Sequence, residues 1–416
     1  MKNRILAVGF VLLIACGPPY YTFRILDPFI RMNAPRVSPP GLGSDLYPRW
    51  VGIRAALFNH ENPYSQATTD RIQAGYYGHV VGTGEHRDPQ RFAYPAHVVV
   101  LLAPLAFLDF QTARALFLAI LILTTILATL MWLRIEQPPN MNAISLSLAT
   151  LLIIASWPVV QGLYAQQITL LVAALLAGGF YCVWRKQLGV AGLLLAFSTI
   201  KPQLSWLSVL WLLVWSLSDR RRRKLTWWFG ASMILLLGAS ELLVPGWPLN
   251  WLSTFHDYLG YTGSSLNFQV LFGPLPGALI TLVVVMFGGL ALWRTRFSPA
   301  TSEMFLFTVA FIPALTLCIL PTWSWATYNQ VLLIPAAIYL YRQWGRVRAA
   351  RIEVRLCYGI TMLALAWGYL ATLFLTSAHL LGAVIPDESQ LRLPMYNFFL
   401  VAPLTLLSLY LLRPVS

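Results

Sequence analysis

The sequence predicts an all-α integral membrane protein, a polytopic helical bundle with about twelve transmembrane helices. Charged residues make up only 11% of the chain and apolar residues 58%. So little charge cannot cover a water-facing surface, for which about 25% is usual. Apolar stretches of the length that crosses a bilayer recur along the 416 residues. The 16 tryptophans are typical of side chains at membrane interfaces.

The apolar stretches follow one another with short breaks. Several are shorter than the roughly 20 residues of a straight span. No Gly/Ser linker or low-complexity tract divides residues 1–416, so we expect a single polytopic membrane domain. A further short apolar segment lies at 94–108. The predicted spans are 5–23, 111–133, 142–157, 168–184, 187–200, 203–218, 225–244, 269–293, 303–320, 329–341, 356–376 and 394–412.

Three clusters of basic residues, at 219–224, 294–296 and 342–355, predict the topology. They account for much of the net charge of +14 and lie in short loops, as the positive-inside rule requires of cytoplasmic segments. Two spans separate successive clusters, so all three fit on one side. No basic stripe lies beside a soluble module, so we expect no nucleic-acid partner.

Counting back from these clusters places loop 24–93 on the extracytoplasmic side, provided that segment 94–108 dips into the membrane and returns. The alternative is that 94–108 crosses and another short segment does not. The run before Cys16 fits an uncleaved first span, and a lipoprotein cleavage signal is the alternative. The cysteines have no metal-ligand spacing, so they predict neither a zinc site nor a disulfide framework.

Loop 24–93 holds most of the polar residues that chemistry requires, and we expect it to be the catalytic loop. Segment 51–58 is amphipathic, which predicts a short helix lying in the membrane interface. Ser44 or Asp45 can cap this helix, and Asn62-Pro63 can end it.

Asp45 follows the first span, Tyr47 comes two residues later, and a short helix precedes Asn62-Pro63-Tyr64. Four further stretches follow in order. They are Phe92 to Pro95, Ser156 to Gln167, Lys201-Pro202-Gln203 and Pro321 to Pro335. The order of these motifs resembles glycosyltransferase family 87. The sequence differs from the family pattern at Ala96, at Ala165-Gln166-Gln167 and at Tyr328-Asn329-Gln330, where the family has Pro, Gly-Gln and late histidines.

The resemblance implies a GT-C membrane fold and transfer of a sugar, with mannose as the family's sugar, from a polyprenyl-phosphate donor. The expected partners are this donor, a lipid or glycan acceptor and membrane lipids, and the expected location is the cell membrane, with the site facing outward. A phosphate leaving group departs without a proton, so one carboxylate suffices as general base. Glycoside hydrolysis, by contrast, usually needs two.

Asp45 is the predicted general base, with a helix-capping role as the alternative. Lys201 lies between two apolar spans, where a lone cation is costly, and is the predicted ligand of the donor phosphate. The alternative for Lys201 is to snorkel to lipid headgroups. Eight further residues are candidates for substrate binding. They are Arg49, Arg54, Tyr94, Gln166, Gln167, His256, Tyr328 and Asn329.

The other loop acids, Asp27, Glu61, Asp70, Glu85 and Asp88, are expected to be solvated charges. No metal site or cofactor is predicted, because His79, His86 and His97 show no helical pairing with an acid. A divalent cation between the donor phosphate and an aspartate stays open. The alternative function is a lipid or solute transporter or flippase, which should place ionisable residues at mid-membrane on several spans.

Overall fold

The computed structural model describes residues 2–33, 39–82, 84–85, 87–136, 142–262, 265–321, 326–382 and 388–414. Within these ranges every regular element is a helix, apart from one isolated β-bridge between Leu266 and Pro321. The predicted all-α class is therefore confirmed.

Six helical segments are long and apolar enough to cross a membrane, which supports a polytopic membrane protein. They include α1 (Lys2–Tyr21), α6 (Phe110–Glu136), α12 (Lys224–Leu243), α15 (Pro274–Arg294), α19 (Ile352–Leu380) and α21 (Phe398–Leu411).

A seventh span is formed if α7 (Ala143–Ile154) and α8 (Trp157–Tyr164) count as one, although they meet at a bend of 56°. The bend falls at Ser156, whose extended backbone (ψ 147°) separates the two helices, and Pro158 stands in the first turn of α8, where a proline is well tolerated.

The predicted number of about twelve spans is not confirmed, because five apolar stretches form helices of only 10–17 residues. They are α5 (His97–Ala106), α9 (Ile168–Trp184), α10 (Leu188–Ser198), α11 (Pro202–Leu217) and α16 (Glu303–Ile319). Most side chains of α9 and α16 are buried. Helix α9 packs between α6 and α10, and α16 packs against α11, α17 (Ile334–Arg342) and α21. These two helices are apolar because protein surrounds them.

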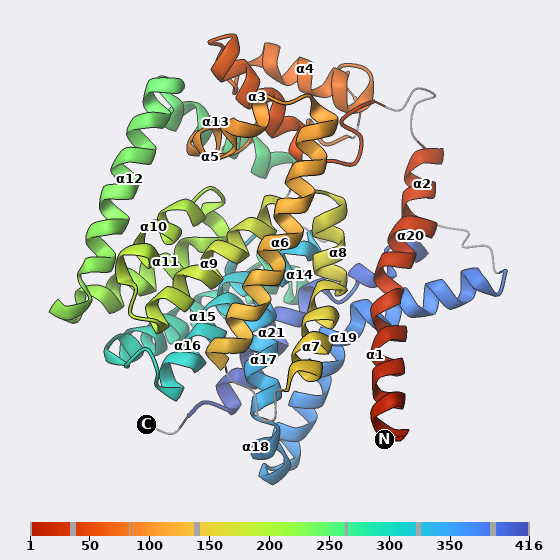
Figure 1. Ribbon diagram of the computed structural model, residues 1–416, viewed down its shortest axis with the longest axis vertical. Helices are drawn as coiled ribbons and strands as arrows, with labels where there is room; N and C mark the ends of the chain where they lie inside the picture. Colours follow the sequence, from red (N-terminus) through yellow and green to blue (C-terminus); the bar gives the residue numbers. More distant parts are fainter. Residues whose placement is uncertain are drawn as a thin grey trace.

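At one end of the bundle, α3 (Leu46–Phe58), α4 (Gln66–Tyr77), α5 and α13 (Trp247–Thr262) form a cap (Figure 1). Helix α3 contacts α4, α5 and α6, and most of its residues are buried. The predicted interfacial position of this helix is not confirmed. Gly52 permits the close packing, since a Cβ atom there would lie 2.3 Å from the Phe92 ring. Neither Ser44 nor Asp45 caps α3 through its side chain.

Helix α5 covers the core of the segment predicted to dip into the membrane. Its ten residues extend about 15 Å, half the thickness of a bilayer's hydrocarbon core. It packs against α3 and α12. The re-entrant path of 94–108 stays a prediction.

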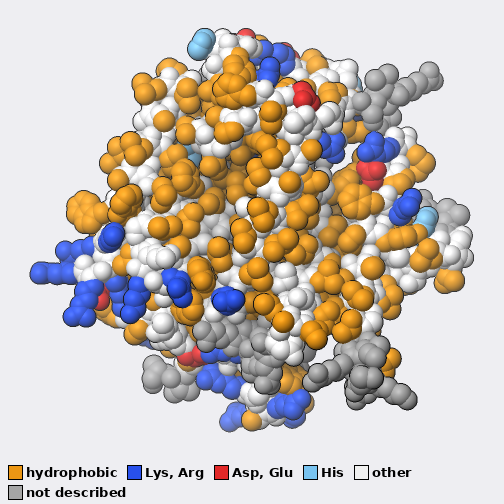
Figure 2. All heavy atoms as spheres, in the orientation of Figure 1, with side chains coloured by type: hydrophobic (Ala, Val, Ile, Leu, Met, Phe, Trp, Pro, Cys, Tyr) orange, Lys and Arg blue, Asp and Glu red, His pale blue; other side chains and the backbone are white. Residues whose placement is uncertain are grey.

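The basic clusters lie away from the cap. Helix α12 begins at Lys224 far from α3, and α18 (Trp344–Ala349), which carries Arg346 and Arg348, lies at the end opposite α4 (Figure 1). Figure 2 shows Lys and Arg side chains gathered at the lower left and lower edge of this face, with apolar side chains over most of its middle. The molecule thus has a basic end and a cap end, separated by an apolar zone.

Candidate active site

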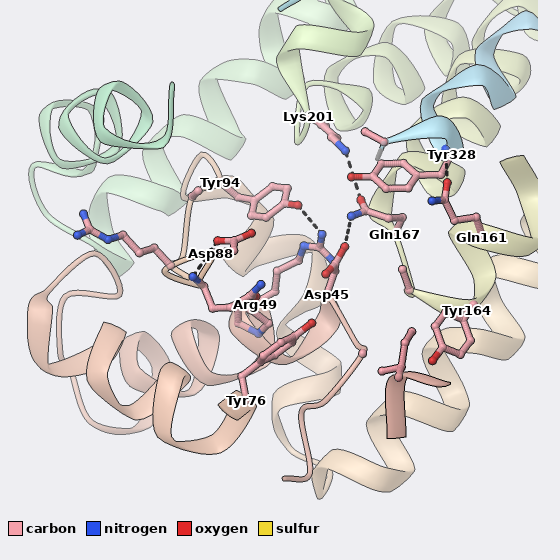
Figure 3. A pocket seen from close by; sticks show the side chains of 18 of the residues that line it. Asp45, Arg49, Tyr76, Asp88, Tyr94, Gln161, Tyr164, Gln167, Lys201 and Tyr328 are labelled. Carbon is pink, nitrogen blue, oxygen red and sulfur yellow. Dashed lines mark hydrogen bonds between the residues drawn. The ribbon is translucent and has the colours of Figure 1, made fainter. Parts of the chain in front are cut away.

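A cavity of about 460 Å³ lies between the cap and the bundle, within the usual range for small-molecule sites. Its lining comes from distant parts of the chain, including α3, α8, α13, the start of α11, and η4 (Thr327–Leu333). Six of the ten predicted site residues line it (Figure 3). They are Asp45, Arg49, Tyr94, Gln167, Lys201 and Tyr328.

Asp45 stands at the N-terminus of α3, yet its carboxylate makes no hydrogen bond to that helix. Its backbone N–H donates to the carbonyl of Ala165 at 2.8 Å, and its Oδ2 accepts a hydrogen bond from Nε2 of Gln167. Burial raises the pKa of Asp45, while Arg49, Lys201 and the Gln167 amide oppose that rise. The carboxylate is therefore held toward the cavity rather than used as a cap.

Lys201 is 7% exposed and precedes Pro202, the first residue of α11. Its ammonium donates to Oγ1 of Thr169 at 2.7 Å and to Oε1 of Gln167 at 3.3 Å, and it lies 5.1 Å from the centre of the Tyr328 ring. Burial, and next the charge of Arg49, lower the pKa of Lys201 to about 7, against the effect of Asp45. The side chain points into the protein, so it does not snorkel to headgroups.

The side-chain amide of Gln167 thus connects the carboxylate of Asp45 to the ammonium of Lys201. Gln167 donates to Asp45 through Nε2 and accepts from Lys201 through Oε1. Both bonds fix the orientation of the amide, because its two ends carry opposite hydrogen-bonding roles. The arrangement holds a carboxylate and an ammonium on the same cavity wall without a direct ion pair between them.

Arg49 is fully buried beneath this pair. Its Nη2 donates to the hydroxyl of Tyr94, its Nη1 donates to the carbonyl of Gln166 at 3.3 Å, and its guanidinium lies 4.4 Å from the centre of the Tyr94 ring. A guanidinium this deep is costly unless a negative group faces it. Asp45 supplies part of that compensation, and an anionic ligand in the cavity would supply more.

The family model of glycosyltransferase family 87 matches residues 92–322, more than half of the chain. The chain belongs to glycosyltransferase family 87. The match includes Tyr94, Gln167 and Lys201, whereas Asp45 and Arg49 precede it. No curated protein and no solved structure matches the chain. Family membership makes the protein a membrane glycosyltransferase and favours an enzyme over the alternative of a transporter.

Four predicted residues of this family 87 enzyme lie outside the cavity lining. Arg54 donates to the carbonyl of Ala106 at 2.6 Å and so anchors α3 to the end of α5. His256 is exposed on α13, whereas Trp251 and Phe255 of that helix line the cavity.

Gln166 and Asn329 instead hold the framework together. The side-chain amide of Gln166 accepts a hydrogen bond from Oγ of Ser44 at 2.5 Å and donates one to the carbonyl of Arg114 at 2.7 Å. These bonds join the loop that precedes α3 to helix α6. Oδ1 of Asn329 accepts from Oγ1 of Thr169 at 3.2 Å and joins η4 to α9.

The structure contradicts the expectation that Asp88 is a solvated loop charge. Asp88 is half-buried and lines the cavity of the glycosyltransferase, and burial raises the pKa of its carboxyl group. Its backbone carbonyl accepts from the Tyr77 hydroxyl at 2.7 Å, and Gln73 donates to the carbonyl of Pro89 at 2.8 Å. These two α4 side chains turn the loop inward. Its proximity to Phe92–Pro95 in sequence was the signal that could have indicated its position.

Gln161 was likewise not chosen as a site residue, although it lies within one of the matching stretches, Ser156 to Gln167. Its Oε1 accepts from Oγ1 of Thr327 at 2.5 Å and from the backbone N–H of Tyr328 at 2.8 Å. It therefore fixes Tyr328 over Lys201 by joining α8 to η4.

Two exposed acids match their expected solvated state, Glu61 paired with Arg71 and Glu85 paired with His79.

Within the described ranges, no three His, Cys, Asp or Glu side chains come together as a possible metal site. Of the histidines considered earlier, His86 lies outside the described residues. His97 is buried, shares a hydrogen bond of 3.1 Å with Oγ1 of Thr199, and has its pKa lowered to about 4 by burial. It is therefore a neutral packing residue at physiological pH.

Proposed function

We propose that this glycosyltransferase transfers mannose from a polyprenyl-phosphate donor to an acceptor hydroxyl at the extracytoplasmic face, with Asp45 as general base. The observation that carries the proposal is the bridge through Gln167, which holds Asp45 and Lys201 on one wall of the same cavity. A transfer that releases a phosphate needs these two groups, a base for the hydroxyl and a cation for the leaving group.

In the proposed step, the acceptor oxygen forms a bond to the anomeric carbon while the bond from that carbon to the phosphate oxygen breaks. The bonding electron pair stays on the phosphate, and the hydroxyl proton passes to the carboxylate of Asp45. Lys201 and Arg49 stabilise the charge that develops on the departing phosphate. No second acid is required, because a phosphate leaves without protonation.

One side of the cavity suits a lipid donor. It is formed by apolar side chains of η1 (Thr22–Leu26) and α2 (Asp27–Met32), which form the last part of the first candidate span, Val8–Met32, and by residues from the C-terminal part of the chain. They are Leu26, Phe29, Ile30, Leu391 and Met395. Such a wall can receive the first isoprene units while the phosphate meets Lys201.

The proposed side of the membrane follows from the charge distribution. Arg220, Arg221 and Arg222 lie together in η2 (Arg220–Arg222), at the turn before α12, and the cap lies at the other end of the molecule (Figure 1). By the positive-inside rule this turn faces the cytoplasm, so the cavity would face outward.

The test measures transfer of radiolabelled mannose from a synthetic polyprenyl-phosphate donor to a lipid extract by the purified enzyme. Asp45→Asn should lower the rate by about 10²–10⁴-fold. Asp70→Asn is the matched control, because its carboxylate bonds only to Gln66 of the same helix among the hydrogen bonds described. Transfer from a sugar nucleotide without any lipid phosphate, or an active Asp45→Asn enzyme, would contradict the proposal.

A further inference from the structure

A second cavity of about 310 Å³ adjoins the first and has a different character. Its walls include Asp27 and Arg31 of α2 together with Gln111 and Arg114 of α6. Tyr164 and Ile30 line both cavities. A polar, charged chamber therefore shares a wall with the chamber that holds Asp45.

The partition between the two cavities is thin. The Tyr164 hydroxyl donates to Oδ1 of Asp27 at 3.0 Å. Leu42 lines the second cavity and Gly43 the first, and a Cβ atom on Gly43 would lie 3.7 Å from the Tyr164 hydroxyl oxygen. Two residues beyond Gly43 stands Asp45, so a group bound in the second cavity needs only to pass the Tyr164 side chain to reach the carboxylate.

Arg114 is the feature that indicates a ligand. It is half-buried in the first turns of α6, and among the described residues its guanidinium makes no hydrogen bond, ion pair or ring contact. Arg31, in contrast, pairs with Asp27 at 2.8 Å. The cavity thus has one positive charge in excess, carried by a planar donor group suited to phosphate or carboxylate.

The position of Arg114 relative to the reaction centre is fixed. Its backbone carbonyl accepts from Nε2 of Gln166 at 2.7 Å, and the adjacent Gln167 binds Asp45. In Figure 3, Lys201 and Tyr164 are drawn on opposite sides of Asp45. A direct displacement needs the incoming hydroxyl and the leaving phosphate on opposite faces of the anomeric carbon, which matches an acceptor on the Tyr164 side.

We propose that the second cavity is the acceptor subsite and binds a negatively charged group of the acceptor through Arg114. This inference rests on the proposed transferase chemistry at Asp45. An acceptor with a phosphate group two or three bonds from the reacting sugar would place that anion on the guanidinium and its hydroxyl beside Asp45. An uncharged acceptor would leave Arg114 without a partner.

The binding test uses sn-glycerol 3-phosphate as the probe and glycerol as its neutral counterpart, with calorimetry of the purified full-length enzyme. The Lys201→Gln enzyme is the background, so that the ammonium at the donor-phosphate position does not contribute. We expect the probe to bind in that background and Arg114→Gln to weaken binding about tenfold or more. Arg185→Gln, which removes an exposed arginine stacked on Trp184, is the control and should leave binding unchanged. Equal affinity of the probe for the background enzyme with and without Arg114→Gln would overturn the proposal.

The kinetic test separates this inference from the proposed function. Two acceptors are compared, an octyl mannoside and its 6-phosphate. Arg114→Gln should raise KM for the phosphorylated acceptor about tenfold and leave kcat and the donor KM unchanged, whereas loss of Asp45 acts on kcat. If Asp45→Asn stays active while the selective Arg114 effect persists, the base assignment is wrong and the subsite stands. If Arg114→Gln affects both acceptors equally, the subsite is wrong.

A last arm distinguishes a lipid headgroup from a soluble phosphate. Phosphatidylglycerol and phosphatidylcholine are added to the detergent micelles at equal concentration. Inhibition by phosphatidylglycerol that disappears in Arg114→Gln would assign the subsite to a lipid headgroup. Inhibition by sn-glycerol 3-phosphate alone, again dependent on Arg114, would assign it to a soluble or glycan-borne phosphate.

Discussion

Replacing Lys201 is the most direct probe of the reaction centre. The ammonium is buried, lies 2.7 Å from Oγ1 of Thr169, and faces the cavity beside the ring of Tyr328. If it binds the donor phosphate, Lys201→Gln removes a charge-assisted hydrogen bond worth about 1.5–3 kcal/mol. We therefore expect kcat/KM for the polyprenyl-phosphate donor to fall by about 10- to 150-fold.

The same substitution should not destabilise the fold, because a buried ammonium with only neutral hydrogen-bond acceptors costs more to desolvate than a glutamine amide. The thermal midpoint therefore provides a second readout. Lys201→Arg should recover only part of the activity, since Tyr328 limits the room for a larger guanidinium. Lys186→Gln, at an exposed turn before α10, is the control. Unchanged donor affinity and kcat/KM in Lys201→Gln would refute the assignment.

Three further outcomes follow from the structure. The pH profile of kcat/KM should be bell-shaped. Activity should fall below the raised pKa of Asp45, because the base becomes protonated, and above about pH 7, because Lys201 loses its proton. A flat profile between pH 5 and 9 would contradict both roles. Gly52→Ala should destabilise the cap by about 1–3 kcal/mol, because the new methyl overlaps the Phe92 ring. Gly230→Ala inside α12 meets no atom within 4 Å, so it should not lower the thermal midpoint and should raise it slightly through helix propensity. In a cysteine-free background, an impermeant thiol reagent should label Asn59→Cys and not Arg221→Cys in intact cells, and the reverse pattern would invert the topology.

The positions of the helices could be predicted from the sequence, because apolar stretches such as 111–133 and 356–376 fall on α6 and α19. The number of spans could not. Helices α9 and α16 are apolar because other helices cover them, and a side chain buried in protein has the same composition as one that faces lipid.

Site residues could be predicted where a sequence motif constrained the backbone. They could not be predicted where the direction of a side chain determines whether it reaches the cavity. Asp45 lies in the polar loop after the first apolar stretch, Lys201 lies at the break between two others, and both reach the cavity. Arg54 lies on the same helix as Arg49 and points to the end of α5 instead. Asp88 was missed because its burial depends on contacts of its loop with Gln73 and Tyr77 of α4, so its nearness to Phe92–Pro95 could indicate its position but not its burial.

The lowered pKa of Lys201 connects the resting site to donor binding. Near pH 7.5 a lysine with a pKa of about 7 is uncharged in about three quarters of the molecules. A sugar phosphodiester is a monoanion with no proton that titrates in this range. When it arrives beside the amine, an opposite charge favours the protonated form and raises the pKa of Lys201, typically by about 1–3 units. Donor binding must then be accompanied by uptake of protons from the solvent.

This uptake can be measured by titrating a non-hydrolysable donor analogue into the enzyme at pH 7.5 in two buffers of different ionisation enthalpy. We expect a difference in the observed heats that corresponds to up to about 0.75 proton per bound donor. The difference should vanish in Lys201→Gln. It should persist in Asp45→Asn, which excludes the carboxylate as the group that takes up the proton. Identical heats in the two buffers for the wild-type enzyme would mean that Lys201 is already fully charged before the donor arrives, and then the alkaline limb of the pH profile would have to belong to another group.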